Sequence, residues 1–296
     1  MNNPKISVCL PTYNRVGYAK EAIKSVINQT FGDFELIVSD DASTEDVESM
    51  VQSFDDRRIK CFRQEINLGF IKNWNFCLIN SSGKYIKIMG DDDVLLPNCL
   101  EESIRILEKE EFVGMVCSDY WTIDGNGNFI NNHQFNDESF RIFKKNKIEM
   151  GKKFIKEYLL GRRRVGLPSA ILFKKDLLKI VGNFDESAGP PADIDLWLRI
   201  LQISDFYYID EKLLKMRWHK DNLSKKLEED LFYYKYVINL LSKNYCVVKR
   251  CFCLTEKIKL FFIYSRIIFK KVFNFKLLNH GKVFLRDIIM LIKLIF

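Results

Sequence analysis

Short apolar segments alternate with amphipathic ones through the first 118 residues, and this alternation restricts the fold more than any other feature. Apolar side chains at helical spacing predict helices at residues 17–28, 70–80 and 97–109. The apolar segments between them predict strands at residues 6–10, 34–38, 59–63, 85–89 and 113–118. Strands separated by helices favour a mostly parallel sheet with helices on both faces, and therefore an α/β fold.

Polar clusters follow three of these strands, at residues 11–14, 40–41 and 91–93. The carboxyl ends of parallel strands meet at one edge of a sheet, and ligands of such sheets bind outside that edge. Since three clusters coincide there, we predict the binding site at this edge.

The third cluster consists of three consecutive aspartates, Asp91, Asp92 and Asp93, placed directly after Gly90. Crowded carboxylates cost free energy unless a cation lies among them. Mg²⁺ and Mn²⁺ prefer oxygen ligands and often share them with phosphate groups. The triplet therefore predicts a divalent-cation site, and a solvated acidic turn is the alternative.

After residue 119 the pattern is less regular. Residues 124–127 predict a tight turn, and the polar residues 131–147 predict a loop. Further elements are expected as helices at residues 148–160 and 192–203 and as strands at 170–173, 206–209 and 213–218.

Five segments, in order, resemble glycosyltransferase family 2, whose members are inverting transferases with the GT-A (Rossmann-like) fold. The matching segments are SVCLPTYNR at residues 7–15, FELIVSDDAS at 34–43, NLG at 67–69, GKYIKIMGDDDVLLP at 83–97 and DIDLWLR at 193–199. The resemblance spans about residues 5–224 and does not include the remaining tail.

This resemblance implies a nucleotide site formed by the following residues: Pro11, Thr12, Tyr13, Asn14, Asp41 and Asp91. It places Asp41 at the edge of the base and Asp91 near the ribose. The alternative for Thr12 and Asn14 is that they cap or turn the chain, and Asp40 is expected to be structural.

The resemblance also implies a metal site at Asp92 and Asp93, to which His219 is added late in the domain. The alternative for His219 is a surface histidine whose hydrogen bonds are already satisfied and which binds no metal. The family commonly has an aspartate where Gly90 stands, so the choice among the three aspartates stays open. It also frequently has a glutamate where this chain has Ala192.

The family resemblance makes Asp193 the general base, the group that removes the proton from the attacking hydroxyl. Asp193 and Asp195 lie two residues apart at a helix start, so they point in different directions. Asp195 is expected to pair with Arg199, four residues further on. A single displacement with one base inverts the anomeric centre.

The tail from residue 225 onward carries 15 Lys and Arg against 5 Asp and Glu, whereas the whole chain has a net charge of +7. Its apolar runs are interrupted by basic residues, which predicts amphipathic helices on an anionic membrane surface. The alternative is packing on the catalytic core or on a second subunit, as in a homo-oligomer. Nucleic-acid binding is not expected, because the binding edge is acidic. We expect a catalytic domain at residues 1–224 and a helical region at 225–296.

Together these features predict a metal-dependent glycosyltransferase with Mn²⁺ or Mg²⁺ as cofactor. The expected substrates are a UDP-linked sugar and a hydroxyl of a growing surface glycan, which a lipid carries. The start of the chain resembles no secretory signal, so a cytoplasmic enzyme on the inner membrane face is expected. Alternatives are a non-catalytic sugar-binding or scaffolding module and a sugar-phosphate nucleotidyltransferase. The nucleotidyltransferase would need a glycine-rich basic loop in place of residues 11–14.

Overall fold

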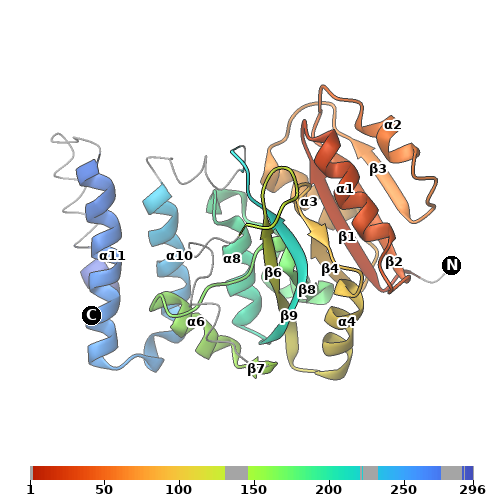
Figure 1. Ribbon diagram of the computed structural model, residues 1–296. Coiled ribbons are helices and arrows are strands. Elements are labelled where there is room, and N and C mark those ends of the chain that lie inside the picture. The colour runs from red at the N-terminus through yellow and green to blue at the C-terminus, as the bar shows by residue number, and fades with distance from the viewer. Residues whose placement is uncertain are drawn as a thin grey trace.

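One nine-stranded sheet organises residues 6–217 of the protein (Figure 1). The computed structural model describes residues 3–130, 146–220, 222, 233–274, 289 and 291–295. The strands follow the spatial order β3-β2-β1-β4-β8-β6-β9-β5, and β7 pairs with β9. Their bounds are β1 Ile6–Thr12, β2 Phe34–Asp40, β3 Ile59–Arg63, β4 Tyr85–Ile88, β5 Val94–Leu95, β6 Val113–Ile123, β7 Lys147–Glu149, β8 Ile171–Lys174 and β9 Asp205–Arg217.

Most strands of the sheet run in the same direction. β1 is parallel to β2 and β4, β2 is parallel to β3, and β6 is parallel to β9. β8 lies antiparallel between β4 and β6, while β5 and β7 are antiparallel to β9. β2 and β4 are buried along their whole length, as expected for strands that helices cover on both faces. The predicted α/β fold with a mostly parallel sheet is confirmed.

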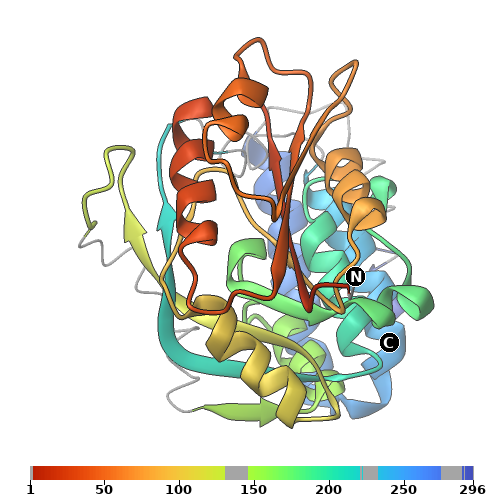
Figure 2. The same cartoon turned by 90° about the vertical axis from the view of Figure 1, so that its right-hand side faces the viewer.

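Helices cover both faces of the sheet, and α1 and α3 lie on opposite sides of the first parallel strands (Figure 2). The helices are α1 Val16–Ile27, α2 Val47–Gln52, α3 Phe70–Asn80, α4 Cys99–Lys109, α6 Gly151–Leu159, α7 Leu178–Val181, α8 Ala192–Leu201, α10 Tyr233–Val248 and α11 Leu254–Asn274. Short 3₁₀ helices are η1 Pro168–Ala170, η2 Lys175–Leu177, η3 Glu186–Ala188 and η4 Lys249–Cys251.

Gly83 permits the close approach of the α3–β4 turn to β1. A Cβ at this position would lie 2.5 Å from the backbone nitrogen of Ser7. The Gly83 N–H donates to the Ser7 hydroxyl over 2.8 Å, which fixes the start of β4 beside β1. The end of β4, with the aspartates that follow it, is thereby placed beside the end of β1.

Three sequence predictions need correction in detail. The helix predicted from residue 148 begins at Gly151, because residues 147–149 pair antiparallel with β9 as strand β7. The two strands predicted at 206–218 form the single strand β9, which accommodates irregularities opposite Ser118 and Asp119. The helix predicted from residue 97 begins at Cys99. Most of the predicted loop at 131–147 lies outside the described residues.

The C-terminal helices pack against the side of the sheet domain. α10 contacts α6 and α8, and α11 contacts α10 (Figure 1). Leu241, Val248 and Leu260 belong to the same hydrophobic core as the sheet. The Tyr245 hydroxyl donates to the carbonyl of Ile295 over 3.0 Å, so the last described residues return to α10. In the described part of the chain, every helix is too short or too polar to cross a membrane.

Candidate active site

A cavity of about 690 Å³ opens at the carboxyl ends of β1, β2 and β4. Most of the predicted site residues line it, although they come from segments up to 182 positions apart. The predicted residues at its wall are Pro11, Thr12, Tyr13, Asp41, Asp91, Asp92, Asp93 and Asp193. Asn14 and His219 lie beside it: Asn14 stands between Tyr13 and Arg15 of the wall, and His219 contacts Asp92.

Asp91 and Asp92 are held together by one arginine. Arg15 Nη1 lies 3.1 Å from Asp91 Oδ1 and 3.1 Å from Asp92 Oδ2. The Thr12 hydroxyl donates to the other oxygen of Asp91 over 2.9 Å. The end of β1 is therefore joined directly to the acidic loop after β4.

Asp92 also contacts two residues that follow β9. His219 Nε2 lies 3.0 Å from Asp92 Oδ2, and Asn222 Nδ2 donates to the same oxygen over 3.3 Å. The His219 side chain is only 7% exposed, so it is no surface histidine. Within the described ranges, no group of three or more His, Cys, Asp or Glu side chains is arranged so that it could hold a metal ion.

Asp93 contacts different residues from Asp92 and organises the loop. The Ser169 hydroxyl donates to Asp93 Oδ2, and the backbone N–H of Arg217 donates to Asp93 Oδ1 over 3.0 Å. Arg217 itself is 2% exposed, and its Nε donates to the main-chain carbonyl of Asp92. Its Nη2 pairs with Glu21 at 2.5 Å. Arg217 therefore joins β9, the acidic loop and α1.

The buried acidic cluster contains more carboxylates than cationic side chains to balance them. Withdrawal from water, followed by the nearby Asp92 carboxylate, raises the pKa of Asp91 to about 6 and that of Asp93 to about 7. Arg15 opposes the shift at Asp91, and Ser169 opposes the shift at Asp93. A further cation in the cavity would be stabilised by this excess of negative charge.

Asn14 turns the chain, as its alternative interpretation stated. It adopts a φ of +52°, and its side-chain oxygen accepts from the backbone N–H of Thr44 over 2.8 Å. Its own N–H donates to the Ser43 hydroxyl over 2.8 Å. These bonds shape the loops that follow β1 and β2.

Asp41 and Asp40 diverge at the end of β2. Asp41 accepts from the backbone N–H groups of Leu68 and Gly69 over 2.7 and 3.0 Å, and it reaches the cavity. Asp40 instead pairs with Arg63 at 3.1 Å and accepts from the Ser43 N–H. The structural role predicted for Asp40 is confirmed.

Asp193 and Asp195 also separate as predicted. Asp193 is half-buried at the start of α8 and lines the cavity. Burial raises its pKa to about 6, and backbone N–H groups at the helix start partly offset this effect. Asp195 is buried and pairs with Arg199 at 2.7 Å, which confirms its predicted partner. A carboxylate with a pKa near 6 can accept a proton at neutral pH.

An apolar wall completes the cavity between α3 and α8. The ring of Trp74 lies 5.2 Å from that of Phe70 and 4.9 Å from that of Phe184, measured between centroids. Further apolar residues at the wall are Leu167, Pro190, Pro191, Ile194, Met216 and Trp218. A pocket with apolar walls and a few converging polar groups is typical of small-molecule sites.

The sequence matches the model of the glycosyl transferase family 2 over residues 7–179, more than half of the chain. The chain belongs to glycosyltransferase family 2. It is therefore a nucleotide-sugar-dependent glycosyltransferase, and the nucleotidyltransferase and non-catalytic alternatives are set aside.

Two relatives illustrate the range of this family. The chain is 32% identical over 275 residues to an uncharacterized glycosyltransferase of Methanocaldococcus jannaschii, covering 91% of this chain and 89% of that protein. It is 36% identical over 176 residues to the GalNAc(5)-diNAcBac-PP-undecaprenol beta-1,3-glucosyltransferase of Campylobacter jejuni. That alignment covers 52% of this chain and 56% of the relative.

Solved structures share the family 2 fold. TarS 1-349 of S. aureus, in complex with UDP-GlcNAc, aligns with a TM-score of 0.72 and 17% identity over 99% of this chain and 82% of TarS 1-349. The mannosyltransferase PcManGT of Pyrobaculum calidifontis, in complex with GDP-Man and Mn²⁺, aligns with a TM-score of 0.59 and 13% identity over 99% and 81% of the two chains. At these identities the likeness supports the fold.

Several residues of this family 2 site were not assigned from the sequence. Ser169 contacts Gly90 and Asp93, which lie 79 and 76 positions earlier in the chain. A local sequence pattern does not predict contacts over such distances. Asn222 likewise reaches Asp92 across 130 positions. Arg15 could have been found, because it directly follows the motif at residues 11–14 and carries the charge that the aspartates need.

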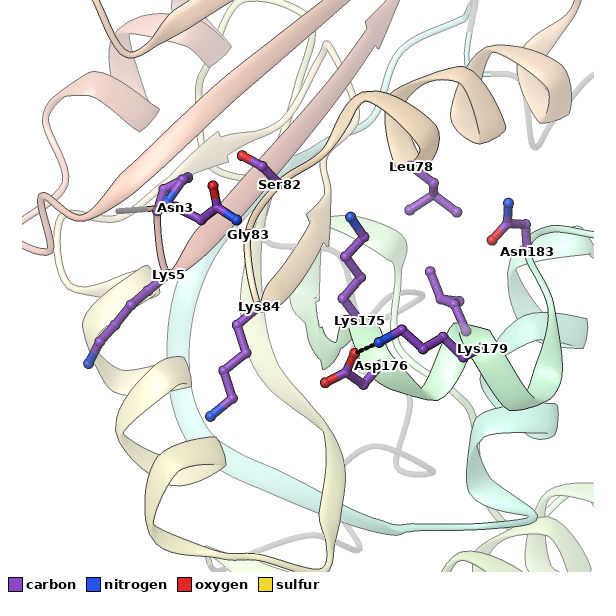
Figure 3. Close-up of a pocket in the computed structure, with 12 residues that line it drawn as sticks. Asn3, Lys5, Leu78, Ser82, Gly83, Lys84, Lys175, Asp176, Lys179 and Asn183 are labelled. Atoms are coloured by element: carbon purple, nitrogen blue, oxygen red, sulfur yellow. Dashed lines mark ion pairs between the residues drawn. The ribbon is translucent and has the colours of Figure 1, made fainter. Parts of the chain in front are cut away.

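A second cavity, of about 640 Å³, lies at the opposite edge of the sheet, near the amino ends of β1 and β4 (Figure 3). Lysines line it, but most of their amines already have partners. Lys179 pairs with Asp176 at 2.7 Å, and Lys175 donates to the Ser81 carbonyl over 2.6 Å. This second cavity shares no residue with the acidic cluster, so we assign the family 2 chemistry to the first one.

Proposed function

We propose that this protein is a metal-dependent, inverting glycosyltransferase that uses a UDP-linked sugar. One observation carries the proposal: Asp193 lines the same cavity as Thr12, Asp41 and the paired carboxylates of Asp91 and Asp92. A base on one side of a cavity and an acidic cluster on the other are the arrangement that a single displacement on a nucleotide sugar needs.

The nucleotide lies, in this proposal, along the ends of β1 and β2. The segment from Pro11 to Asn14 and the carboxylate of Asp41 form that side, where Tyr13 is 45% exposed. Asp41 is already oriented by two backbone N–H groups and keeps lone pairs for a base edge. Asp91, fixed by Thr12, is placed for the ribose. UDP as the nucleotide is supported by the UDP-GlcNAc complex of the fold relative TarS.

The residues fit a Mn²⁺ or Mg²⁺ ion that shares its coordination with a diphosphate. Asp92 and His219 approach each other at the cavity, and Asp93 adds negative charge behind them. Such ions commonly bind through one or two protein ligands together with phosphate oxygens and water. We propose Asp92 and His219 as the direct ligands, since Asp93 is occupied by Ser169 and Arg217. When bound, the ion supplies charge that stabilises the departing diphosphate. Mn²⁺ with a nucleotide sugar is present in the fold relative PcManGT.

Asp193 is the proposed general base. It accepts the proton of the acceptor hydroxyl as that oxygen attacks the anomeric carbon, and the leaving group departs from the opposite face. Its raised pKa keeps it a stronger base than an exposed carboxylate while leaving it ionised at neutral pH.

The acceptor is proposed to be a growing surface glycan on a lipid carrier. The apolar wall around Trp74 and Ile194 lies in the same cavity as Asp193 and offers flat surfaces to a sugar ring. The name of the Campylobacter jejuni relative gives an undecaprenyl diphosphate-linked glycan as its substrate.

The C-terminal helices are proposed to bind an anionic membrane surface on the cytoplasmic side. On α11 the side chains of Leu254, Ile258 and Phe262, spaced by four residues, are 65%, 40% and 65% exposed. Lys257 and Lys259 flank this apolar stripe. An exposed apolar stripe with basic flanks is typical of helices that lie in a membrane interface. Contact between two copies of the chain is the competing use of the stripe.

The proposal is tested by a screen of nucleotide sugars for hydrolysis or binding with and without Mn²⁺. We expect a response to one UDP-linked sugar that disappears when the metal is chelated. Nucleotide affinity that ignores both addition and chelation of Mn²⁺ or Mg²⁺ would contradict the metal-dependent mechanism.

A further inference from the structure

Arg15 is a cationic side chain that bridges two carboxylates of the cavity, those of Asp91 and Asp92. A single nitrogen, Nη1, lies 3.1 Å from both Asp91 Oδ1 and Asp92 Oδ2. The side chains of Asp91 and Asp92 are only 10% and 12% exposed, so their interaction with a cation is little screened by water. Arg15 therefore stabilises this pair of like charges in the absence of a bound ion.

The position of Arg15 Nη1 conflicts with that of a bound cation. The Asp92 oxygen that Arg15 contacts is the same one that faces His219 and Asn222. An ion held by Asp92 Oδ2 and His219 needs space next to this oxygen, and it repels the guanidinium. Arg15 and the ion are thus competitors for one oxygen.

Arg15 is placed so that it can leave this position. Its side chain is 24% exposed, and it lines the cavity at the residue that precedes α1. The other arginine of the acidic loop, Arg217, is 2% exposed and is held by Asp92, Glu21 and the 124–125 carbonyls. Because the Arg15 side chain is partly exposed and Arg217 is buried, Arg15 is the better placed of the two to turn toward a ligand.

We propose that Arg15 is a resting counter-ion of Asp91 and Asp92 that turns to the diphosphate of the donor when the metal ion binds. This inference rests on the proposed function. Guanidinium groups bind phosphate oxygens in a planar, bidentate geometry. A diphosphate can therefore replace the two carboxylates as the hydrogen-bonding partner of Arg15. Metal and nucleotide then bind cooperatively. Binding of either one moves Arg15 away from the carboxylates, and binding of the other requires the same movement.

The test measures Mn²⁺ affinity directly, from the electron paramagnetic resonance signal of free Mn²⁺, with and without UDP. For the unaltered protein we expect UDP to tighten Mn²⁺ binding at least about tenfold. In Arg15→Ala the competing charge is gone, so Mn²⁺ without UDP should bind at least about fivefold more tightly. In Arg15→Ala, UDP should therefore increase the Mn²⁺ affinity by a smaller factor than it does in the unaltered protein. Arg15→Lys should retain most of the cooperativity, because it keeps the charge.

Arg63→Gln provides a matched control. Arg63 pairs with Asp40, which turns away from the acidic cluster, so its loss should leave the Mn²⁺ affinity unchanged. Circular dichroism checks that each variant is folded, and Arg15→Gln serves as the second neutral variant if Arg15→Ala is not. If a folded neutral variant binds Mn²⁺ no more tightly than the unaltered protein, or keeps its full UDP effect, the role of Arg15 is refuted. If the unaltered protein binds no Mn²⁺ even with UDP, the metal-dependent function itself fails, and this inference fails with it.

Discussion

Lys243, on the C-terminal helix α10, forms an ion pair of 2.8 Å with Asp185, which lies in the segment leading to the proposed base. The same amine is 3.7 Å from Asp195 in α8. Nearby, a Cβ at Gly189 would lie 2.5 Å from the ring of Tyr236, so α10 also packs closely against the approach to α8. The C-terminal region therefore supports the helix that carries Asp193, in addition to any role at a membrane.

Replacing Lys243 by methionine should lower kcat by about threefold to tenfold with little change in the KM for the donor. Asp193 would be held less firmly, while the nucleotide side of the cavity is untouched. The unfolding free energy should fall by no more than about 1 kcal/mol, because the pair is partly exposed. Steady-state kinetics and urea unfolding measure the two effects. Lys249→Met, an exposed lysine after α10, is the control, and equal kinetics of the two variants would contradict a supporting role of Lys243.

The pH dependence of the reaction should report Asp193. Its raised pKa means that protons bind it more readily than an ordinary aspartate, and only the deprotonated form can act as the base. We therefore expect kcat/KM to fall about tenfold per pH unit below about pH 6 and to level off above it. Asp193→Asn should lose at least about 100-fold in kcat while binding UDP normally. Normal turnover by Asp193→Asn would show that another group is the base, and Glu186→Gln is a control for losing a nearby exposed carboxylate.

Asp92 and Asp93 should respond differently to the same substitution. Asp92→Asn removes the proposed ligand, so turnover and the Mn²⁺ dependence of nucleotide binding should disappear. Asp93→Asn instead weakens the contacts with Ser169 and Arg217, so the main effect should be a loss of stability of about 1–3 kcal/mol. Thermal unfolding and Mn²⁺ titration distinguish these results. Intact Mn²⁺ binding by Asp92→Asn would overturn its assignment as a ligand.

Glu35 should make the unfolding free energy depend on pH in acid solution. Buried in β2, it pairs with Lys60 at 2.6 Å and accepts from the Ser7 and Ser82 hydroxyls. Although burial opposes ionisation, these partners together lower the pKa of Glu35 from 4.5 to about 2. Because the folded-state pKa is lowered, its stabilisation is present above pH 4.5 and is lost as the pH falls through about 2.

The measurement is the difference in unfolding free energy between the unaltered protein and Glu35→Gln. We expect a difference of about 1–2 kcal/mol at pH 6, after allowance for the half-exposed Lys60, and a smaller one at pH 3. A difference that grows as the pH falls would have the wrong sign for this explanation.

The apolar stripe on α11 should govern membrane binding. Replacing Leu254, Ile258 and Phe262 by glutamine should reduce co-sedimentation with phosphatidylglycerol vesicles by at least about tenfold, because apolar area leaves the interface. The control is Ile180→Gln, which removes an exposed apolar side chain on α7 and leaves α11 unchanged. Unchanged sedimentation of the triple variant, with a change in its oligomeric state, would assign the stripe to contact between two copies.

The sequence by itself determined the α/β class, most strand and helix positions, the edge that binds ligands and the acidic triplet at Asp91, Asp92 and Asp93. These features depend on periodicity and on residue type within about ten positions, which a linear pattern retains. The pairing of Asp195 with Arg199 and the structural role of Asp40 were predicted from local spacing and motif position.

Only the tertiary structure determined which groups each carboxylate contacts. Both oxygens of Asp93 are occupied because Ser169 and the backbone of Arg217 reach it from segments 76 and 124 positions away. The strand at 147–149 replaced a predicted helical turn because β9 offered it an edge to pair with. Such contacts depend on the path of the chain in three dimensions, since hydrogen bonds and charges act between atoms that are close in space, whatever their distance along the sequence.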